Sequence, residues 1–126
     1  MPWSIYYNEK SNIIETKYDG LMSGKEIEAA ARETLDLGRE KNTNLYLGDC
    51  TTLQQSKSLF DIYSLMKCLL NLKVEKTNRE AIILPEFKMT AELLQFYETL
   101  ALNRGFQVKI FEDRETATAW LLSFKD

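Results

Sequence analysis

The chain has 126 residues, which is enough for one domain and too few for two of ordinary size. Its 16 Lys and Arg residues against 19 Asp and Glu residues give a net charge of −3. This mild acidity argues against nucleic acid as a partner, because binding to phosphates requires a basic face. Histidine is absent, which excludes His-dependent catalytic triads and zinc sites with His ligands.

The two cysteines, Cys50 and Cys68, form no CxxC motif and indicate neither a metal site nor a disulfide framework. Residues 1–4 lack the basic and apolar stretches of a signal peptide. The apolar-rich segment 59–72 is interrupted by polar residues and is shorter than the roughly 20 apolar residues that cross a bilayer. We therefore expect one domain over residues 1–126, located in the cytoplasm, with no cofactor, no metal and no membrane span.

The first elements in chain order form a hairpin. Residues 3–8 and 13–18 are rich in aromatic and branched side chains and read as strands, and residues 9–12 form the polar turn between them. In the second strand, alternate residues should face opposite sides. Ser23 followed by Glu26 forms a capping box, which starts a helix that continues to about residue 41. One stripe of this helix should face the sheet: Ile27, Ala31, Leu35 and Gly38.

The middle of the chain predicts a short strand at 44–49, a polar loop at 50–57 and a second helix. Ser58 and Asp61 can cap this helix, which continues to about residue 72. Its apolar residues cover a broad arc, which suggests burial against more than the sheet alone.

The last part predicts two further strand and helix pairs. Residues 81–84 form a strand that ends at Pro85, and Thr90 caps a helix that stops near Arg104. Gly105 is placed for a left-handed C-terminal cap. Residues 107–111 form the last strand, and a final helix begins after Asp113. Strict alternation of strand and helix predicts an α/β fold: a mostly parallel five-stranded sheet with an antiparallel N-terminal strand and four helices.

Short segments along nearly the whole chain carry a family resemblance. They are Tyr18-Asp19-Gly20 with the Ser23 cap, Leu47-Gly48-Asp49, Phe60-Asp61-Ile62-Tyr63, Ala81-Ile82-Ile83-Leu84, Arg104-Gly105-Phe106, Val108-Lys109-Ile110-Phe111 and Ala117-Thr118-Ala119-Trp120-Leu121. In this order and spacing, the chain resembles the SpoIIAA-like proteins, which have the STAS and CRAL-TRIO type of fold. The resemblance implies a βα superhelix of four turns whose sheet order follows the chain. It also implies a small bacterial cytoplasmic protein.

STAS regulators of this kind bind partner proteins, and the resemblance carries two of their site positions onto this chain. Asp49 matches an aspartate that ends their third strand. Ser56 or Ser58 falls where a phosphorylated serine begins their next helix. The regulators have an Asp-Ser-Ser-Gly signature there, whereas this chain reads Gln-Gln-Ser-Lys-Ser over 54–58. A phosphate on Ser58 would meet free amides at a helix N-terminus, but the same serine can also serve as a plain N-cap.

Asp49 also lies where parallel sheets place ligand crevices, at the C-terminal end of a strand. Glu86, in the segment 85–89 after the next strand, would share that rim and could form one wall of a pocket. Each acid also has a simpler interpretation. Asp49 can orient the loop that follows it, and Glu86 can belong to a polar connection between two elements. Lys57 could approach Cys50 at this rim, but nothing in the sequence requires a reactive thiol.

The strands also suggest an exposed face. If all helices gather on one side of the sheet, the residues Glu15, Lys17, Tyr46 and Lys109 should line a half-polar open face on the other. Such a face can meet a second copy of the chain or another protein.

These observations favour a non-enzymatic regulatory or protein-binding module of the STAS-like type. Its distinguishing feature would be an exposed rim between Asp49 and Ser58 with no deep pocket. The alternative is a carrier of a small molecule or lipid, with an apolar pocket between the helices at 59–72 and 90–104. An enzyme that uses Asp49 and Glu86 as acid and base ranks third, because no spacing requires it.

Overall fold

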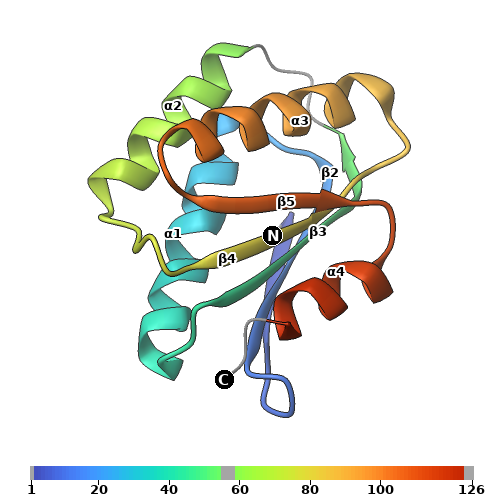
Figure 1. Cartoon of the computed structure of the whole chain (residues 1–126). Helices are drawn as coiled ribbons and strands as arrows, with labels where there is room; N and C mark the ends of the chain where they lie inside the picture. Colours follow the sequence, from blue (N-terminus) through green and yellow to red (C-terminus); the bar gives the residue numbers. More distant parts are fainter. Residues whose placement is uncertain (1, 55–58, 124–126) are drawn as a thin grey trace.

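The computed structural model describes residues 2–54 and 59–123 and consists of five strands and four helices. Their bounds are β1 Trp3–Asn8, β2 Ile13–Leu21, α1 Gly24–Lys41, β3 Leu45–Gln54, α2 Leu59–Asn71, β4 Arg79–Ile83, α3 Lys88–Asn103, β5 Gln107–Phe111 and α4 Arg114–Leu122. The strands lie in the order β1-β2-β3-β4-β5, with β1 antiparallel to β2 and the other pairs parallel. This arrangement confirms the predicted α/β fold (Figure 1).

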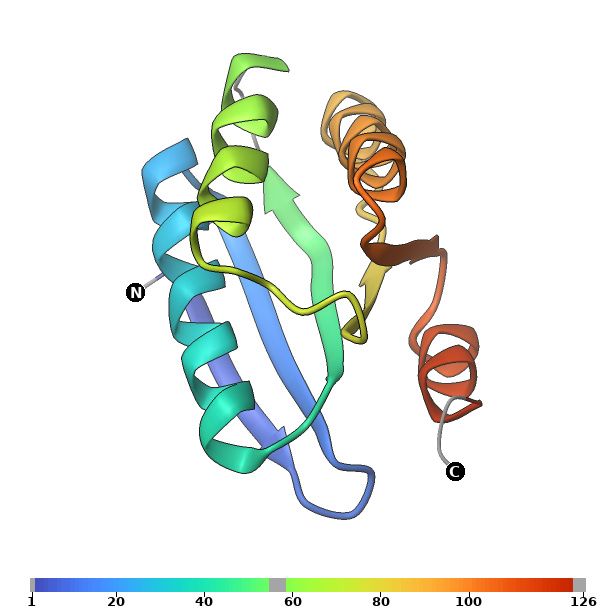
Figure 2. The same ribbon diagram turned by 60° about the vertical axis from the view of Figure 1, so that its left-hand side comes forward.

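The helices cover both faces of the sheet. α1, α2 and α3 lie on one face, whereas α4 lies on the other (Figure 2). The condition for the expected open face, that all helices gather on one side, is therefore not met. α4 covers β3, β4 and β5 but leaves the outer face of β1 open, where Tyr6 is 61% exposed.

Tyr46 corrects the predicted open face most clearly. It pairs in register with the buried Ile14, and its side chain is buried on the α1 side of the sheet. Glu15, Lys17 and Lys109 do lie on the opposite face, because β-strand side chains alternate. Gly38 of α1 leaves room for the Tyr46 side chain on this face, because a Cβ at position 38 would collide with the tyrosine hydroxyl.

The capping signals in the sequence place two helix starts correctly. The amide of Glu26 donates to the Ser23 hydroxyl (3.2 Å), and the amide of Ser23 donates to the Glu26 carboxylate (2.9 Å). At α4, the amide of Thr116 donates to the Asp113 carboxylate (2.8 Å). Each contact satisfies a backbone donor that the first turn leaves without an intrahelical partner.

The start of α3 differs from the prediction. The helix begins at Lys88, with Phe87 as an N-cap residue that makes no side-chain cap hydrogen bond. Thr90, the predicted cap, is a buried residue inside the first turn. Lys88 and Met89 are good helix formers, so the helix extends past the threonine. The end is as predicted, because Gly105 has a left-handed backbone with φ of 81°.

β3 is longer than predicted. It continues through the predicted loop residues Cys50–Gln54, of which the last three, Thr52, Leu53 and Gln54, pair with the end of β2 beyond a register shift between Lys17 and Asp19. β4 pairs with β3 only as far as Asp49. Among the described residues, these last three of β3 therefore have a strand partner on one side only.

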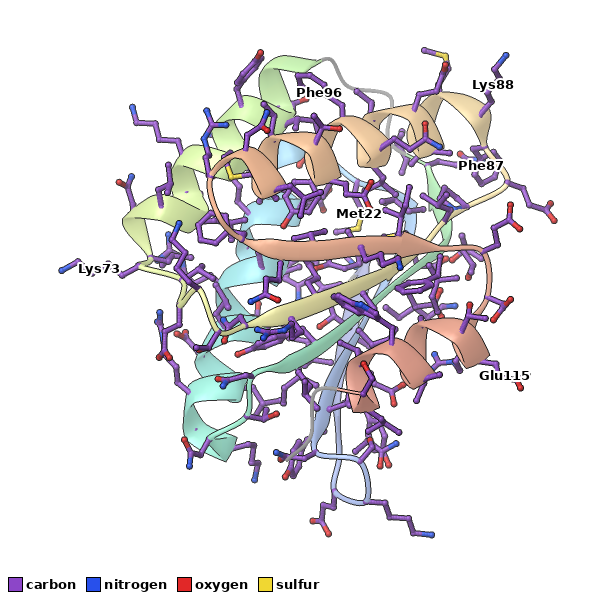
Figure 3. The ribbon with its side chains drawn as sticks, in the orientation of Figure 1. Met22, Lys73, Phe87, Lys88, Phe96 and Glu115 are labelled. Atoms are coloured by element: carbon purple, nitrogen blue, oxygen red, sulfur yellow. The ribbon has the colours of Figure 1, made fainter. Side chains whose placement is uncertain are left out.

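Two hydrophobic cores result, one on each face. The smaller core joins α4 to the sheet through Ile13, Leu45, Leu47, Ala81, Ile83, Ala117 and Leu121. The larger core fills the space between the sheet and the other three helices, around Ile14, Met22, Ala30, Ile62, Met66 and Leu94. Side chains of both cores are drawn in Figure 3, where Met22 lies inside the larger one. Over residues 2–54 and 59–123, no helix combines the length and apolar character that a bilayer crossing needs.

Candidate ligand cavity

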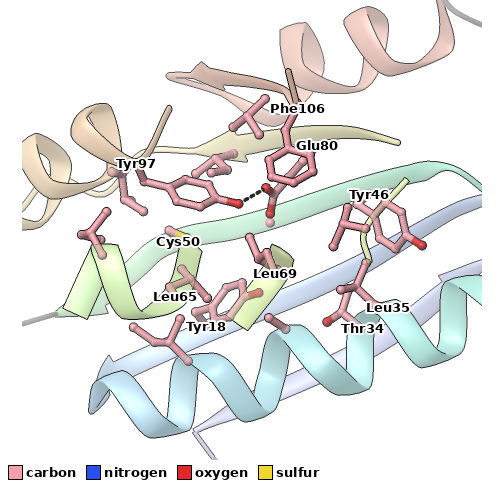
Figure 4. A pocket seen from close by; sticks show the side chains of 18 of the residues that line it. Tyr18, Thr34, Leu35, Tyr46, Cys50, Leu65, Leu69, Glu80, Tyr97 and Phe106 are labelled. Atoms are coloured by element: carbon pink, nitrogen blue, oxygen red, sulfur yellow. Dashed lines mark hydrogen bonds between the residues drawn. The ribbon is translucent and has the colours of Figure 1, made fainter. Parts of the chain in front are cut away.

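The larger core is not completely filled. A cavity of about 110 Å³ lies between the sheet and the helices α1, α2 and α3 (Figure 4). Its floor comes from the alternate positions of the strands that face these helices, including Tyr18, Gly48, Cys50 and Ile82. Its walls and roof come from apolar side chains of the helices and of the following segments: Ile27, Leu35, Ile62, Leu65, Leu69, Leu94 and Phe106. The predicted apolar pocket between α2 and α3 therefore has a counterpart, with α1 and the sheet as additional walls.

A carboxyl group projects into this apolar space. Glu80 of β4 is bonded by Tyr97 of α3, whose hydroxyl donates to Glu80 Oε1 at 2.7 Å (Figure 4). Burial raises the pKa of Glu80 above its ordinary value, and the Tyr97 hydrogen bond only partly opposes this. The protonated form of Glu80 is thus favoured more than for a carboxyl group in water.

Three further titratable groups of the lining, Tyr18, Tyr97 and Cys50, stay neutral. Burial and the nearby Glu80 raise the pKa of both Tyr18 and Tyr97 well above that of a free phenol. The Cys50 thiol also has a raised pKa, because it is buried and lies near Glu80 and Asp49. A reactive thiol requires a lowered pKa, so Cys50 is suited to line a cavity rather than to act as a nucleophile.

The charged groups that line the cavity are all acidic. They are Asp61 of α2, Glu75 in the segment between α2 and β4, and Glu80. No Lys or Arg belongs to the lining within the described ranges 2–54 and 59–123. Glu75 is exposed and Asn78 beside it is half-buried, so this segment forms the polar margin at which the cavity meets solvent.

The predicted site residue Asp49 lies elsewhere. Its side chain faces the α4 side, where it accepts hydrogen bonds from the Thr51 amide (3.0 Å) and the Thr51 hydroxyl (2.7 Å). Arg114 of α4 approaches Asp49 at 3.5 Å and also binds Glu15 at 2.6 Å, while Lys17 lies 3.9 Å from Asp49. Partial burial alone would raise the pKa of Asp49, but the Thr51 hydrogen bonds and the two cations outweigh it and lower the pKa.

Through these contacts Asp49 joins β2, β3 and α4. It is not at the end of its strand, because β3 continues to Gln54. Glu86 is exposed in the connection between β4 and α3 and is not part of the cavity lining. Neither Asp49 nor Glu86 lines this cavity, so the rim that they would share stays a prediction. Ser56 and Ser58 lie outside the described residues, so the phosphosite at Ser58 stays a prediction.

Sequence reasoning missed the cavity carboxyl. β4 reads Arg-Glu-Ala-Ile-Ile, and Glu80 is in phase with the buried Ile82 rather than with the opposite face. An acidic residue at an inward position of an apolar strand was the available signal, because buried carboxyls are rare without a partner.

Comparison with known proteins supports the fold. No protein-family model matches the chain, and no curated protein matches its sequence. Among solved structures, it is similar to an uncharacterized DUF3478-family protein with a SpoIIAA-like fold from Shewanella loihica PV-4. The two are 25% identical with a TM-score of 0.57, and the match covers 94% of this chain and 91% of the other. The chain therefore has the SpoIIAA-like fold that its sequence resemblance predicted.

Proposed function

We propose that this protein binds a small, largely apolar molecule in the cavity between the sheet and α1, α2 and α3, and that it acts as a carrier. The observation that supports the proposal is an apolar cavity of about 110 Å³ that is lined by the hydrogen-bonded pair of the Glu80 carboxyl group and the Tyr97 hydroxyl. A cavity of similar size, about 150 Å³, engineered into another protein binds benzene. In this proposal the protein acts in the cytoplasm and catalyses no reaction.

The expected affinity for a simple hydrocarbon is weak. Burying about 150 Å² of apolar ligand surface gains about 4 kcal/mol at roughly 25 cal/mol per Å². That free energy corresponds to a dissociation constant on the order of 1 mM. A natural ligand that also uses the polar groups of the cavity would bind more tightly.

Titration with toluene, followed by NMR chemical shifts, tests the proposal. Gly48 lies on the cavity floor, and a Cβ there would lie 3.7 Å from Tyr18 and 3.8 Å from Ile82, which is ordinary contact. Gly48→Ala and Gly48→Val should therefore fold and should fill the cavity in two steps. We expect affinity to fall from the wild type to Gly48→Ala and again to Gly48→Val.

Lys109→Val is the matched control, because Lys109 is an exposed strand residue on the opposite face of the sheet. It should leave toluene binding unchanged. Thermal unfolding of each variant checks that the fold is kept. The carrier proposal fails if the wild type shows no saturable shifts at cavity residues. It also fails if Gly48→Val folds and binds toluene as the wild type does.

A regulatory or protein-binding role is the second candidate. It is supported by exposed apolar side chains on α2, where Tyr63 is 51% and Leu70 47% exposed. The Tyr63 ring packs edge-on against Phe96 of α3, with ring centroids 5.6 Å apart, so its position is fixed. The unfilled cavity, the position of Asp49 and the exposure of Glu86 give this role less support than the carrier role.

Sedimentation equilibrium can separate the two roles when the partner is a second copy of the chain. Self-association through α2 predicts a mass that rises with concentration in the wild type and not in Tyr63→Lys. A monomer at all concentrations would contradict binding between copies at this surface.

A further inference from the structure

We infer that the ligand of this cavity is a small organic ammonium ion: an apolar body that carries one cationic nitrogen, bound with the nitrogen at Glu80. The inference rests on the proposed binding function and names the chemical class of ligand. Three observations carry it: the hydrogen bonding of Glu80, the charges around the cavity, and the aromatic rings that line it.

Glu80 has unused hydrogen-bonding capacity. Its Oε1 accepts from the Tyr97 hydroxyl. Glu80 is half-buried, so its second oxygen, Oε2, can be reached from the cavity that the residue lines. A ligand with N–H donors would satisfy Oε2, and a cationic donor would do so most strongly.

The cavity offers no cation of its own. The ion pairs in the described part of the chain involve Glu15, Glu40 and Asp49, and none involves Glu80. Asp61 and Glu75 add two further carboxyl groups to the lining. The ionisable groups of the lining would therefore repel an anionic ligand and attract a cationic one.

The remaining groups around Glu80 suit a cation with an apolar body. The titratable groups that interact with it from the neighbouring elements are Tyr18 of β2, Tyr46 and Cys50 of β3 and Tyr97 of α3, and burial raises the pKa of each. Tyr18, Tyr97 and Phe106 provide aromatic rings to the same cavity (Figure 4). Aromatic faces stabilise ammonium groups, most strongly when water is excluded. Lys76 already makes such a contact from outside the cavity, with its nitrogen 4.3 Å from the Phe106 centroid.

The pKa of Glu80 should respond to a bound ammonium ion. Burial raises this pKa in the unliganded protein. A bound cation favours the carboxylate and lowers the pKa again.

The test compares probes of nearly equal shape and different charge on the full chain. Benzylamine, benzyl alcohol and phenylacetate are titrated at about pH 7.5 by NMR and calorimetry. We expect benzylamine to bind at least about tenfold more tightly than benzyl alcohol. Glu80→Gln should abolish this preference while it keeps the affinity for benzyl alcohol. Glu75→Gln, at the margin of the cavity, should keep most of the preference.

Each contrary result has a distinct meaning. Equal binding of benzylamine and benzyl alcohol overturns the ammonium inference and leaves the carrier function in place. The same holds if phenylacetate binds more tightly than benzylamine, or if Glu80→Gln keeps the full preference. If none of the three probes binds and toluene does not bind either, the carrier function itself is overturned.

Discussion

Glu80 shows how one residue can define the chemistry of a site that carries no recognisable motif. It is a carboxyl group among Ile82, Cys50 and three tyrosines, in a chain without histidine. Its position could have been predicted from strand alternation, since it is in phase with Ile82. Its place in a cavity could not have been predicted, because the cavity depends on side chains from three helices that lie far apart in the sequence.

The raised pKa of Glu80 makes the stability of the protein depend on pH. The folded-state pKa lies above the ordinary value of 4.5, so the folded state binds the proton more tightly than the unfolded state. The contribution of Glu80 to stability is therefore complete below about pH 4.5 and is lost as pH rises through the raised value.

Glu80→Gln removes this titration and keeps an oxygen that can accept from Tyr97. We expect the variant to be more stable than the wild type at about pH 8, with the difference shrinking toward about pH 4.5. Urea unfolding at several pH values measures it. A wild type that gains stability over the variant as pH rises would contradict a buried, uncompensated carboxyl at this position.

At the scale of single elements, local signals located most boundaries. The capping box at Ser23 and the cap at Asp113 are both formed, because each requires only a side chain and an amide three residues away. Thr90 was predicted as a cap in the same way, but it lies inside the first turn of α3, because a threonine can also be accommodated within a helix. The extension of β3 through Thr51 and Thr52 was missed because polar, exposed strand residues resemble a loop in sequence.

Ser23→Ala tests the capping box of α1. Loss of the hydroxyl leaves the Glu26 amide without its side-chain acceptor, so we expect a destabilisation of about 1 kcal/mol. Ser4→Ala, at an exposed position of β1, is the control and should change the free energy of unfolding by less than about 0.5 kcal/mol. Equal effects of the two substitutions in urea unfolding would mean that the cap adds little to stability.

At the scale of the whole molecule, the alternation of strands and helices predicted the sheet order, because right-handed crossovers leave few other arrangements. It did not predict that α4 would cover the second face. That placement follows from Ala117 and Leu121, which pack against Leu47, Ala81 and Ile83. The sheet thus has a hydrophobic core on each face. The face under α1, α2 and α3 contains the cavity, and the face under α4 contains the smaller core. The ion pairs of Arg114 with Glu15 and Asp49 add to that second contact.

Both cysteines of the chain are buried, Cys50 in the cavity wall and Cys68 in α2, and both thiols have a raised pKa. Since the thiolate is the form that reacts with alkylating reagents, neither sulfur competes well for a label while the protein is folded. A single cysteine introduced at an exposed position thus provides the one fast-reacting attachment point for a fluorophore. Motions of α2 and α3 over the cavity can be followed in this way without first removing the native cysteines.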